Sequence, residues 1–191
     1  IIQSEYKFIL KDKYDINTIV KLREGNYKIL PVIDSEGLVV DIVNFRLQKS
    51  YLPVDVVIMA GGRGTRLQPL TDTVPKPLLK VGDKAIIEHN IDRLALFGIV
   101  DYWISVKYLG EQIKEFFGSG KSKNLDIKYV EEDLPLGTVG AVSKINDFCN
   151  DYVLITNSDI LTNLDYEKFF LDFIKKDADI SIVSIPYSVN I

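Results

Sequence analysis

The sequence predicts an α/β protein with a doubly wound, mostly parallel, Rossmann-like sheet, preceded by a small α+β segment. From residue 54 onward, apolar β-branched runs alternate with amphipathic helical periods, which is the pattern of βαβ units. The apolar run 56–60 leads directly into three glycines within four positions, as in ligand-binding turns at the end of a buried strand. Before residue 54 the pattern is one helix followed by two strands. We therefore expect a boundary between residues 1–53 and residues 54–191.

The N-terminal segment is predicted to hold one helix and one hairpin. Residues 15–24 begin with an acidic residue and carry an apolar helical face. Strands are expected over 28–33 and 38–43, because the turn residues Asp34-Ser35-Glu36-Gly37 separate two apolar runs. Residues 44–53 are expected to be a linker.

The predicted elements of the second part follow in chain order. Apolar periodicity and the glycines that end each period define them. They are a buried strand over 56–60, a helix over 86–97, a strand over 101–106, a helix over 111–117, a strand over 125–130, a helix over 137–146, a buried strand over 152–156, a helix over 166–176 and a final strand over 180–185.

Composition excludes several classes of protein. With 191 residues, 47% of them apolar, the chain can bury a core. A net charge of −4 argues against a nucleic-acid partner, and the absence of a long apolar run argues against a membrane span or a signal peptide. Cys149 is the single cysteine, so no internal disulfide can form, and a cytoplasmic location is expected.

The glycine-rich turn after residue 60 is predicted to hold an anion. Its glycines let backbone N–H groups approach a ligand, and Arg63, Arg66 and Lys76 place positive charge around it. The spacing does not match a dinucleotide fingerprint, because Leu67 stands where the third glycine should be, and the Gly-Lys-Ser/Thr end of a Walker A loop is absent.

The turn resembles the signature of the sugar-phosphate nucleotidyltransferases. The matching residues are Ala60-Gly61-Gly62-x-Gly64-Thr65-Arg66-Leu67-x-Pro69-Leu70-Thr71, followed by Pro75-Lys76-Pro77. The resemblance implies that an NTP and a sugar 1-phosphate give an NDP-sugar and pyrophosphate. It implies nucleotide binding by Ala60, Gly61, Gly62, Gly64, Thr65 and Arg66. Arg66 would neutralise the departing pyrophosphate and Lys76 would draw the two phosphates together, so replacing either should lower turnover of an intact parent protein by about 10²-fold.

An acidic turn follows the strand predicted over 125–130. Glu131, Glu132 and Asp133 precede a helix start rich in small residues, which exposes backbone N–H groups. In the family that the chain resembles, this segment lies against the nucleobase, and either Glu131 or Glu132 stands where the edge of the base is read. The resemblance implies nucleotide binding by Glu132, Gly137 and Thr138. A carboxylate accepts two hydrogen bonds from guanine but cannot donate to a pyrimidine carbonyl, so GTP is favoured. A solvated acidic turn is the alternative.

Asp159 follows the strand predicted over 152–156, where side chains of a parallel sheet face its ligand crevice. Mg²⁺ prefers oxygen ligands, and the resemblance assigns Asp159 to the catalytic Mg²⁺. A helix cap is the alternative. His89, the only histidine, is expected to be a packing or solvent-facing residue, because an ionised phosphate nucleophile needs no base.

Residues 29–43 resemble the helix-strand-strand core of a CBS domain, with Asp41 where that family usually has glycine. CBS modules work in pairs, so an intact pair would imply an adenine nucleotide as a further ligand, and a homo-oligomer is left open. A truncated or docking remnant is the other interpretation of this segment.

Alternatives to guanylyl transfer remain open. The chain could be a nucleotide-sensing regulatory module without turnover, a purely structural interaction domain, or an enzyme of thymidylyl, uridylyl or cytidylyl transfer; molybdopterin guanylyl transfer is disfavoured by the extension of the loop. Mannose or glucosamine 1-phosphate are the expected sugar substrates. Members of the family continue beyond the position of Ile191 with a sugar-binding portion and a second acidic metal ligand, so these 191 residues are expected to bind nucleotide and to be inactive alone.

Overall fold

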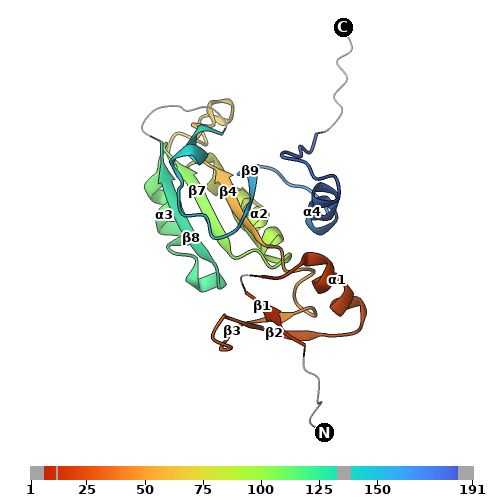
Figure 1. The fold of residues 1–191 in the computed structure, drawn as a ribbon. Coiled ribbons are helices and arrows are strands. Elements are labelled where there is room, and N and C mark those ends of the chain that lie inside the picture. Colours follow the sequence, from red (N-terminus) through yellow and green to blue (C-terminus); the bar gives the residue numbers. More distant parts are fainter. Residues whose placement is uncertain (1–6, 12, 133–138, 185–191) are drawn as a thin grey trace.

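The computed structural model describes residues 7–11, 13–132 and 139–184 (Figure 1). Its centre is a four-stranded parallel sheet in the order β8-β7-β4-β9, which confirms the predicted parallel α/β class. Val56 of β4 pairs with Tyr102 of β7 and with Leu154 of β9. Because β4 is an inner strand with side chains packed on both of its faces, its first five residues are buried. The strands are β4 (Val54–Met59), β7 (Asp101–Val106), β8 (Asp126–Glu131) and β9 (Tyr152–Asn157).

The two faces of this sheet are covered differently. The helices α2 (Ile86–Ala95), α3 (Gly110–Phe117) and α4 (Tyr166–Lys175) pack in one apolar cluster with Val56 and Ile58. On the opposite face Val57 packs against Ala141 and Ile145, from the 3₁₀ helix η4 (Gly140–Lys144) and the residue after it. Within the described residues the α-helices therefore cover one face, so the doubly wound arrangement is not seen there.

Three predicted elements need correction. The helix expected over 137–146 is the short η4, since Val139 and Val142 are β-branched and Gly140 favours neither α-helix nor strand; residues 137 and 138 lie outside the described residues. The strand over 152–156 exists as β9 but is not buried, because Val153 and Ile155 are 37% and 39% exposed on the face that carries Val57, where the cover by η4 does not bury β9.

The final strand predicted over 180–185 is wrong for residues 180–184, which have no regular secondary structure. Ile180 is 77% exposed. A strand needs a neighbour for its backbone hydrogen bonds, and no described strand pairs with this segment. Residue 185 lies outside the described residues.

The N-terminal unit is a three-stranded sheet with one helix. Its order is β1-β2-β3, with β1 parallel and β3 antiparallel to β2, and Val32 joins β1 and β3 through Ile9 and Asp41. This confirms the predicted helix and hairpin, whereas the two-residue β1 was not predicted. Asp15 caps the helix by accepting from the Asn17 backbone N–H at 3.1 Å. The elements are β1 (Ile9–Leu10), α1 (Ile16–Glu24), β2 (Ile29–Ile33) and β3 (Val39–Asn44).

This unit lies against the amino end of β4, opposite the glycine loop (Figure 1). Ile16 and Ile19 belong to the same apolar cluster as Leu94 of α2, so the core is continuous. The segment expected to be a linker has no helix or strand from residue 45 to 53, yet it is packed: the Leu52 N–H donates to the Phe97 carbonyl at 3.0 Å.

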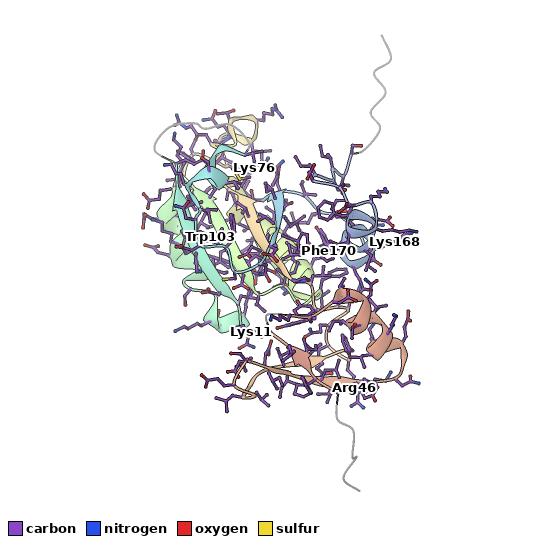
Figure 2. The ribbon with its side chains drawn as sticks, viewed as in Figure 1. Lys11, Arg46, Lys76, Trp103, Lys168 and Phe170 are labelled. Atoms are coloured by element: carbon purple, nitrogen blue, oxygen red, sulfur yellow. The ribbon has the colours of Figure 1, made fainter. Side chains whose placement is uncertain are left out.

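The remaining elements are short. A two-stranded hairpin is formed by β5 (Lys80–Val81) and β6 (Lys84–Ala85), and further 3₁₀ helices are η1 (Thr65–Leu67), η2 (Lys76–Leu78) and η3 (Lys121–Lys123). Figure 2 shows Lys76 at the loop end of the sheet and Phe170 between α4 and the strands. Among the described residues, no helix is both long and apolar enough to span a bilayer.

Candidate functional site

The glycine loop leaves β4 at its carboxyl end. Ala60 is buried and donates its N–H to the Ser105 carbonyl of β7 at 3.0 Å, which fixes where the loop begins. Gly64 has the left-handed φ of 63°. A Cβ there would lie 2.9 Å from Lys76 Cβ and 3.0 Å from Thr71 Cγ2, so both conformation and space require glycine. Around Gly62 there is open space, which leaves the loop accessible to a ligand.

Polar contacts from two directions hold the loop. The buried Thr71 hydroxyl donates to the Gly64 carbonyl at 3.0 Å. Tyr108, after β7, places its hydroxyl 3.1 Å from the Thr71 carbonyl, and its ring lies 4.9 Å below the Arg63 guanidinium. Gln112 of α3 donates to the Thr73 carbonyl at 3.0 Å. Sequence analysis missed Tyr108 and Gln112, because the contact with the loop depends on how β7 and α3 pack beside β4.

Lys76 and Asp159 are brought together as an ion pair between η2 and the turn after β9. Both side chains keep about a third of their surface exposed, so the pair lies at an open edge. The turn that carries Asp159 is fixed by two hydrogen bonds at Ser158: its N–H donates to the Met59 carbonyl at 3.2 Å, and its carbonyl accepts from Asn90 Nδ2 at 2.8 Å. Gly64, Lys76 and Asp159 therefore form one contiguous group.

The two acids at the end of β8 face different neighbours. Glu132 lies against the glycine loop: its Oε1 accepts a hydrogen bond from the Ser105 hydroxyl, and a Cβ on Gly61 would come within 3.3 Å of that oxygen. Glu131 is exposed and pairs with Lys114 of α3. The structure thus distinguishes Glu132, which lies at the glycine loop, from Glu131, which pairs with α3; the sequence alone could not distinguish them. Gly137 and Thr138 lie outside the described residues, and Thr65 and Arg66 are exposed in η1.

A divalent metal would fit this edge only if a bound phosphate supplied further oxygen ligands. No cluster of three or more histidine, cysteine or acidic side chains that could hold a metal occurs in the described part of the chain. The Asp159 carboxylate already faces a cationic group, Lys76. Since Mg²⁺ commonly takes one or two carboxylates and completes its shell with phosphate oxygens and water, one carboxylate beside a bound phosphate suits it.

The other reactive side chains lie apart from the loop. His89 Nε2 is 2.8 Å from the Val81 carbonyl in the small hairpin, which agrees with the expected packing or solvent-facing role. Burial, followed by the Asp101 and Asp55 carboxylates, raises the pKa of the Cys149 thiol, so it is not an activated nucleophile.

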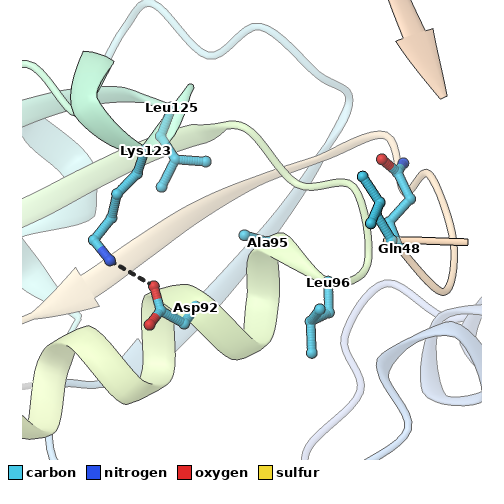
Figure 3. A pocket seen from close by; sticks show the side chains of 7 residues that line it. Gln48, Asp92, Ala95, Leu96, Lys123 and Leu125 are labelled. Atoms are coloured by element: carbon cyan, nitrogen blue, oxygen red, sulfur yellow. Dashed lines mark hydrogen bonds and ion pairs between the residues drawn. The ribbon is translucent and has the colours of Figure 1, made fainter. Parts of the chain in front are cut away.

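A hollow between α2 and the segment after β3 also lies away from the loop. Gln48, Ala95 and Leu96 line it, and Lys123 donates to Asp92 across it at 2.8 Å (Figure 3). Burial acts to raise the pKa of Asp92, but hydrogen bonds from Lys123 and Lys84 outweigh it and lower that pKa. The charges of this hollow are thus already matched to each other.

Known proteins are similar to this chain in sequence. Residues 55–190 match the nucleotidyl transferase family. The chain is 35% identical over 131 residues to a mannose-1-phosphate guanylyltransferase of Mycobacterium tuberculosis, with 68% of this chain and 36% of that protein covered. It is 36% identical to N-acetylmuramate alpha-1-phosphate uridylyltransferase of Neisseria meningitidis, with 60% and 50% covered.

The structure resembles that of HddC from Yersinia pseudotuberculosis complexed with GMP-PN, with a TM-score of 0.54, 29% identity, and 63% of this chain and 54% of that one covered. The chain thus spans about a third to a half of the length of the curated relatives named above. The family match begins at residue 55, so the N-terminal unit lies outside it. With the match covering most of its residues, the chain belongs to the nucleotidyl transferase family.

Proposed function

We propose that this chain is the nucleotide-binding part of a sugar-1-phosphate nucleotidyltransferase that prefers GTP. One observation carries the proposal: Glu132 and the Lys76–Asp159 pair flank the glycine loop from two sides, at the carboxyl ends of β8, β4 and β9 of the same sheet. Ligands of open parallel sheets bind at this edge. The arrangement offers an acceptor for a base on one side and charges for phosphates on the other.

The base would lie beside Glu132. Its carboxylate can accept hydrogen bonds from N1–H and N2–H₂ of guanine, whereas the carbonyl oxygens of uracil or thymine would meet another acceptor. We assign Gly137 and Thr138 to the base by resemblance alone. Curated relatives include guanylyl and uridylyl transferases, so thymidylyl, uridylyl and cytidylyl transfer are the competing proposals.

The triphosphate would lie on the loop. Ala60, Gly61, Gly62, Gly64 and Thr65 would offer backbone N–H groups, and Arg66 would neutralise the pyrophosphate as it leaves. Lys76 would hold the sugar phosphate next to the α-phosphate, which sets up the in-line attack. Asp159 would hold Mg²⁺, which when bound neutralises charge on the phosphates. No proton acceptor is required, because the attacking phosphate oxygen is ionised near pH 7.

The sugar substrate is proposed from the relatives. Mannose 1-phosphate is named for the mycobacterial protein, and glucosamine 1-phosphate remains a further candidate. A sugar-binding part and a second metal ligand are not assigned to any residue of the chain.

We also propose that residues 1–53 are a partial CBS-like unit that docks on the catalytic part. The order helix, strand, strand supports this, as does its packing at the end of β4 away from the loop. In such a unit an adenine nucleotide would bind only if a second copy completed the pair, which also makes a homo-oligomer a proposal.

Thermal denaturation with nucleotides tests the main proposal. GTP, ATP, dTTP, CTP and UTP are each added with Mg²⁺ to the chain of residues 1–191. A ligand that binds only the folded state raises Tm by its mass-action free energy, about 2.7 kcal/mol at 100 times Kd. We expect the largest shift with GTP. A larger shift with a pyrimidine nucleotide contradicts the guanine assignment, and no shift with any nucleotide leaves the interaction-domain alternative.

An assay of pyrophosphate exchange distinguishes an enzyme from a nucleotide-sensing module. In a protein that contains this chain together with a sugar-binding part, GTP and a sugar 1-phosphate should release pyrophosphate. Nucleotide binding without any exchange would favour the nucleotide-sensing regulatory module.

A further inference from the structure

We propose that Ser105 is a positioning residue that makes the site selective for guanine, by fixing the orientation of Glu132. The inference rests on the proposed nucleotide binding and adds a residue that no motif contains. Ser105 does not touch the nucleotide in this account; it acts through the carboxylate.

Ser105 joins the two halves of the site. It lies on β7 with no exposed surface, paired in the sheet between Met59 of β4 and Val130 of β8. Its carbonyl accepts the Ala60 N–H at 3.0 Å, and its hydroxyl donates to Glu132 Oε1. One residue of the sheet therefore sets both the start of the glycine loop and the position of the acid beside it.

Glu132 is further confined by its backbone and by Gly61. The Glu132 N–H donates to the Val106 carbonyl at 3.2 Å, which extends the β7–β8 pairing by one residue. A Cβ on Gly61 would lie 3.3 Å from Glu132 Oε1 and 3.2 Å from Lys107 Cβ. The absence of a side chain at Gly61 thus gives the carboxylate room to lie against the loop.

Selectivity for guanine depends on this orientation. A carboxylate has about four lone-pair sites, and the Ser105 hydroxyl occupies one of them. With Oε1 tied down, the plane of the carboxylate is set, so that N1–H and N2–H₂ of guanine can each meet an oxygen. A carboxylate free to rotate would still accept one hydrogen bond, but it would seldom offer two in the required direction. The second bond is what distinguishes guanine from hypoxanthine, which lacks the N2 amino group.

The test compares GTP with ITP. Kd values for GTP, ITP and UTP with Mg²⁺ are measured by titration calorimetry on the chain of residues 1–191 and on Ser105→Ala, Glu132→Ala and the double variant. A hydrogen bond to a charged group should make GTP roughly 10-fold tighter than ITP for the unmodified chain. Ser105→Ala should reduce this ratio to within about 3-fold of unity, with a smaller effect on ITP and little on UTP. In the Glu132→Ala background, Ser105→Ala should change nothing further.

Ser50→Ala is the matched control. Ser50 is as buried as Ser105, but its hydroxyl has no hydrogen-bond partner in the described structure and lies at the opposite end of the sheet. The control removes the same atom and should leave the GTP to ITP ratio unchanged. A ratio that survives Ser105→Ala, or that falls equally in Ser50→Ala, overturns the positioning role while nucleotide binding stands. If the unmodified chain binds no nucleotide, the proposed function itself fails, and the inference fails with it.

Discussion

The two ends of β4 have opposite characters. At the carboxyl end, the strand opens into glycines, exposed cations and the accessible Lys76–Asp159 pair. At the amino end, it meets apolar and aromatic side chains, including Tyr14 and Tyr51 with ring centroids 5.3 Å apart. The same strand thus has an end suited to ligands and an end suited to packing, and substitutions at the two ends should have separable effects.

Charged side chains also differ between the two ends of β4. Asp55 near the amino end has no exposed surface, and its carboxylate accepts from the Asn150 N–H at 2.7 Å and from Asn150 Nδ2 at 3.0 Å. These bonds satisfy a charge that would otherwise be costly to bury. Lys76 and Asp159 satisfy each other while staying open to solvent, so a phosphate can still reach Lys76. The charged group at the amino end is buried, whereas those at the carboxyl end are accessible to a ligand.

The largest effect on binding is expected from the cations of the loop. Lys76→Ala and Arg66→Ala should each weaken GTP binding about 10- to 100-fold, since a charge-assisted hydrogen bond to phosphate is lost. Because both side chains lie in the open part of the site, Tm without nucleotide should change little. Calorimetric titration with GTP measures the first effect and thermal denaturation the second. Lys28→Ala removes an exposed lysine of the N-terminal unit and is the control; equal losses in all three variants would contradict the assignment.

Gly64→Ala should lower both the stability of the chain and its affinity for GTP. The left-handed φ of 63° costs an L-residue about 1–2 kcal/mol, and the added Cβ would press on Lys76. We expect a lower free energy of unfolding and weaker GTP binding. Gly37→Ala is a matched variant, because Gly37 has φ 82° but nothing within 4 Å of a Cβ. It should lose only the stability that its backbone conformation costs, and it should bind GTP normally. Normal binding by Gly64→Ala would show that the loop tolerates displacement of Lys76.

Arg23→Ala should lower stability alone. Arg23 donates two hydrogen bonds to Glu167 of α4, at 2.9 and 2.7 Å, and this contact raises the pKa of the guanidinium. Removing it leaves a mostly buried carboxylate with fewer partners, at a cost of roughly 1–2 kcal/mol. Urea unfolding measures this loss. Lys114→Ala, which breaks exposed ion pairs, should cost less, and GTP affinity should be unchanged in both variants.

The smallest expected effect is the pH dependence of stability that comes from Asp101, at the amino end of β7. Burial, followed by the Asp55 carboxylate, raises the pKa of Asp101. The folded state therefore holds this proton more tightly than the unfolded state, so stability falls as pH rises through the range between the two pKa values. Asp101→Asn removes the charge and should be more stable than the parent at pH 7. Thermal denaturation from about pH 3.5, just below the usual aspartate pKa, to about pH 7 should show the difference shrinking toward the acid end. A difference independent of pH would contradict this origin.

The sequence predicted the sheet and much of the candidate site for one physical reason: side chains at the carboxyl ends of parallel strands meet at one edge. Asp159, 95 positions after Gly64, thus lies beside Lys76. Ser105 could not be found this way, because its role follows from the register that places it between Met59 and Val130. Residues 180–184 have a strand-like composition, but pairing depends on a neighbour that composition does not reveal.

The contact between Arg23 and Glu167 also bears on how the chain folds. The two residues are 144 positions apart, so their contact closes a very long loop. On a growing chain, α1 emerges well before its partner helix has been synthesised. Until α4 is made, Arg23 lacks this carboxylate partner, and a contact that closes so long a loop is costly in entropy to form early. We expect both units to acquire their final stability together, late, in one cooperative step.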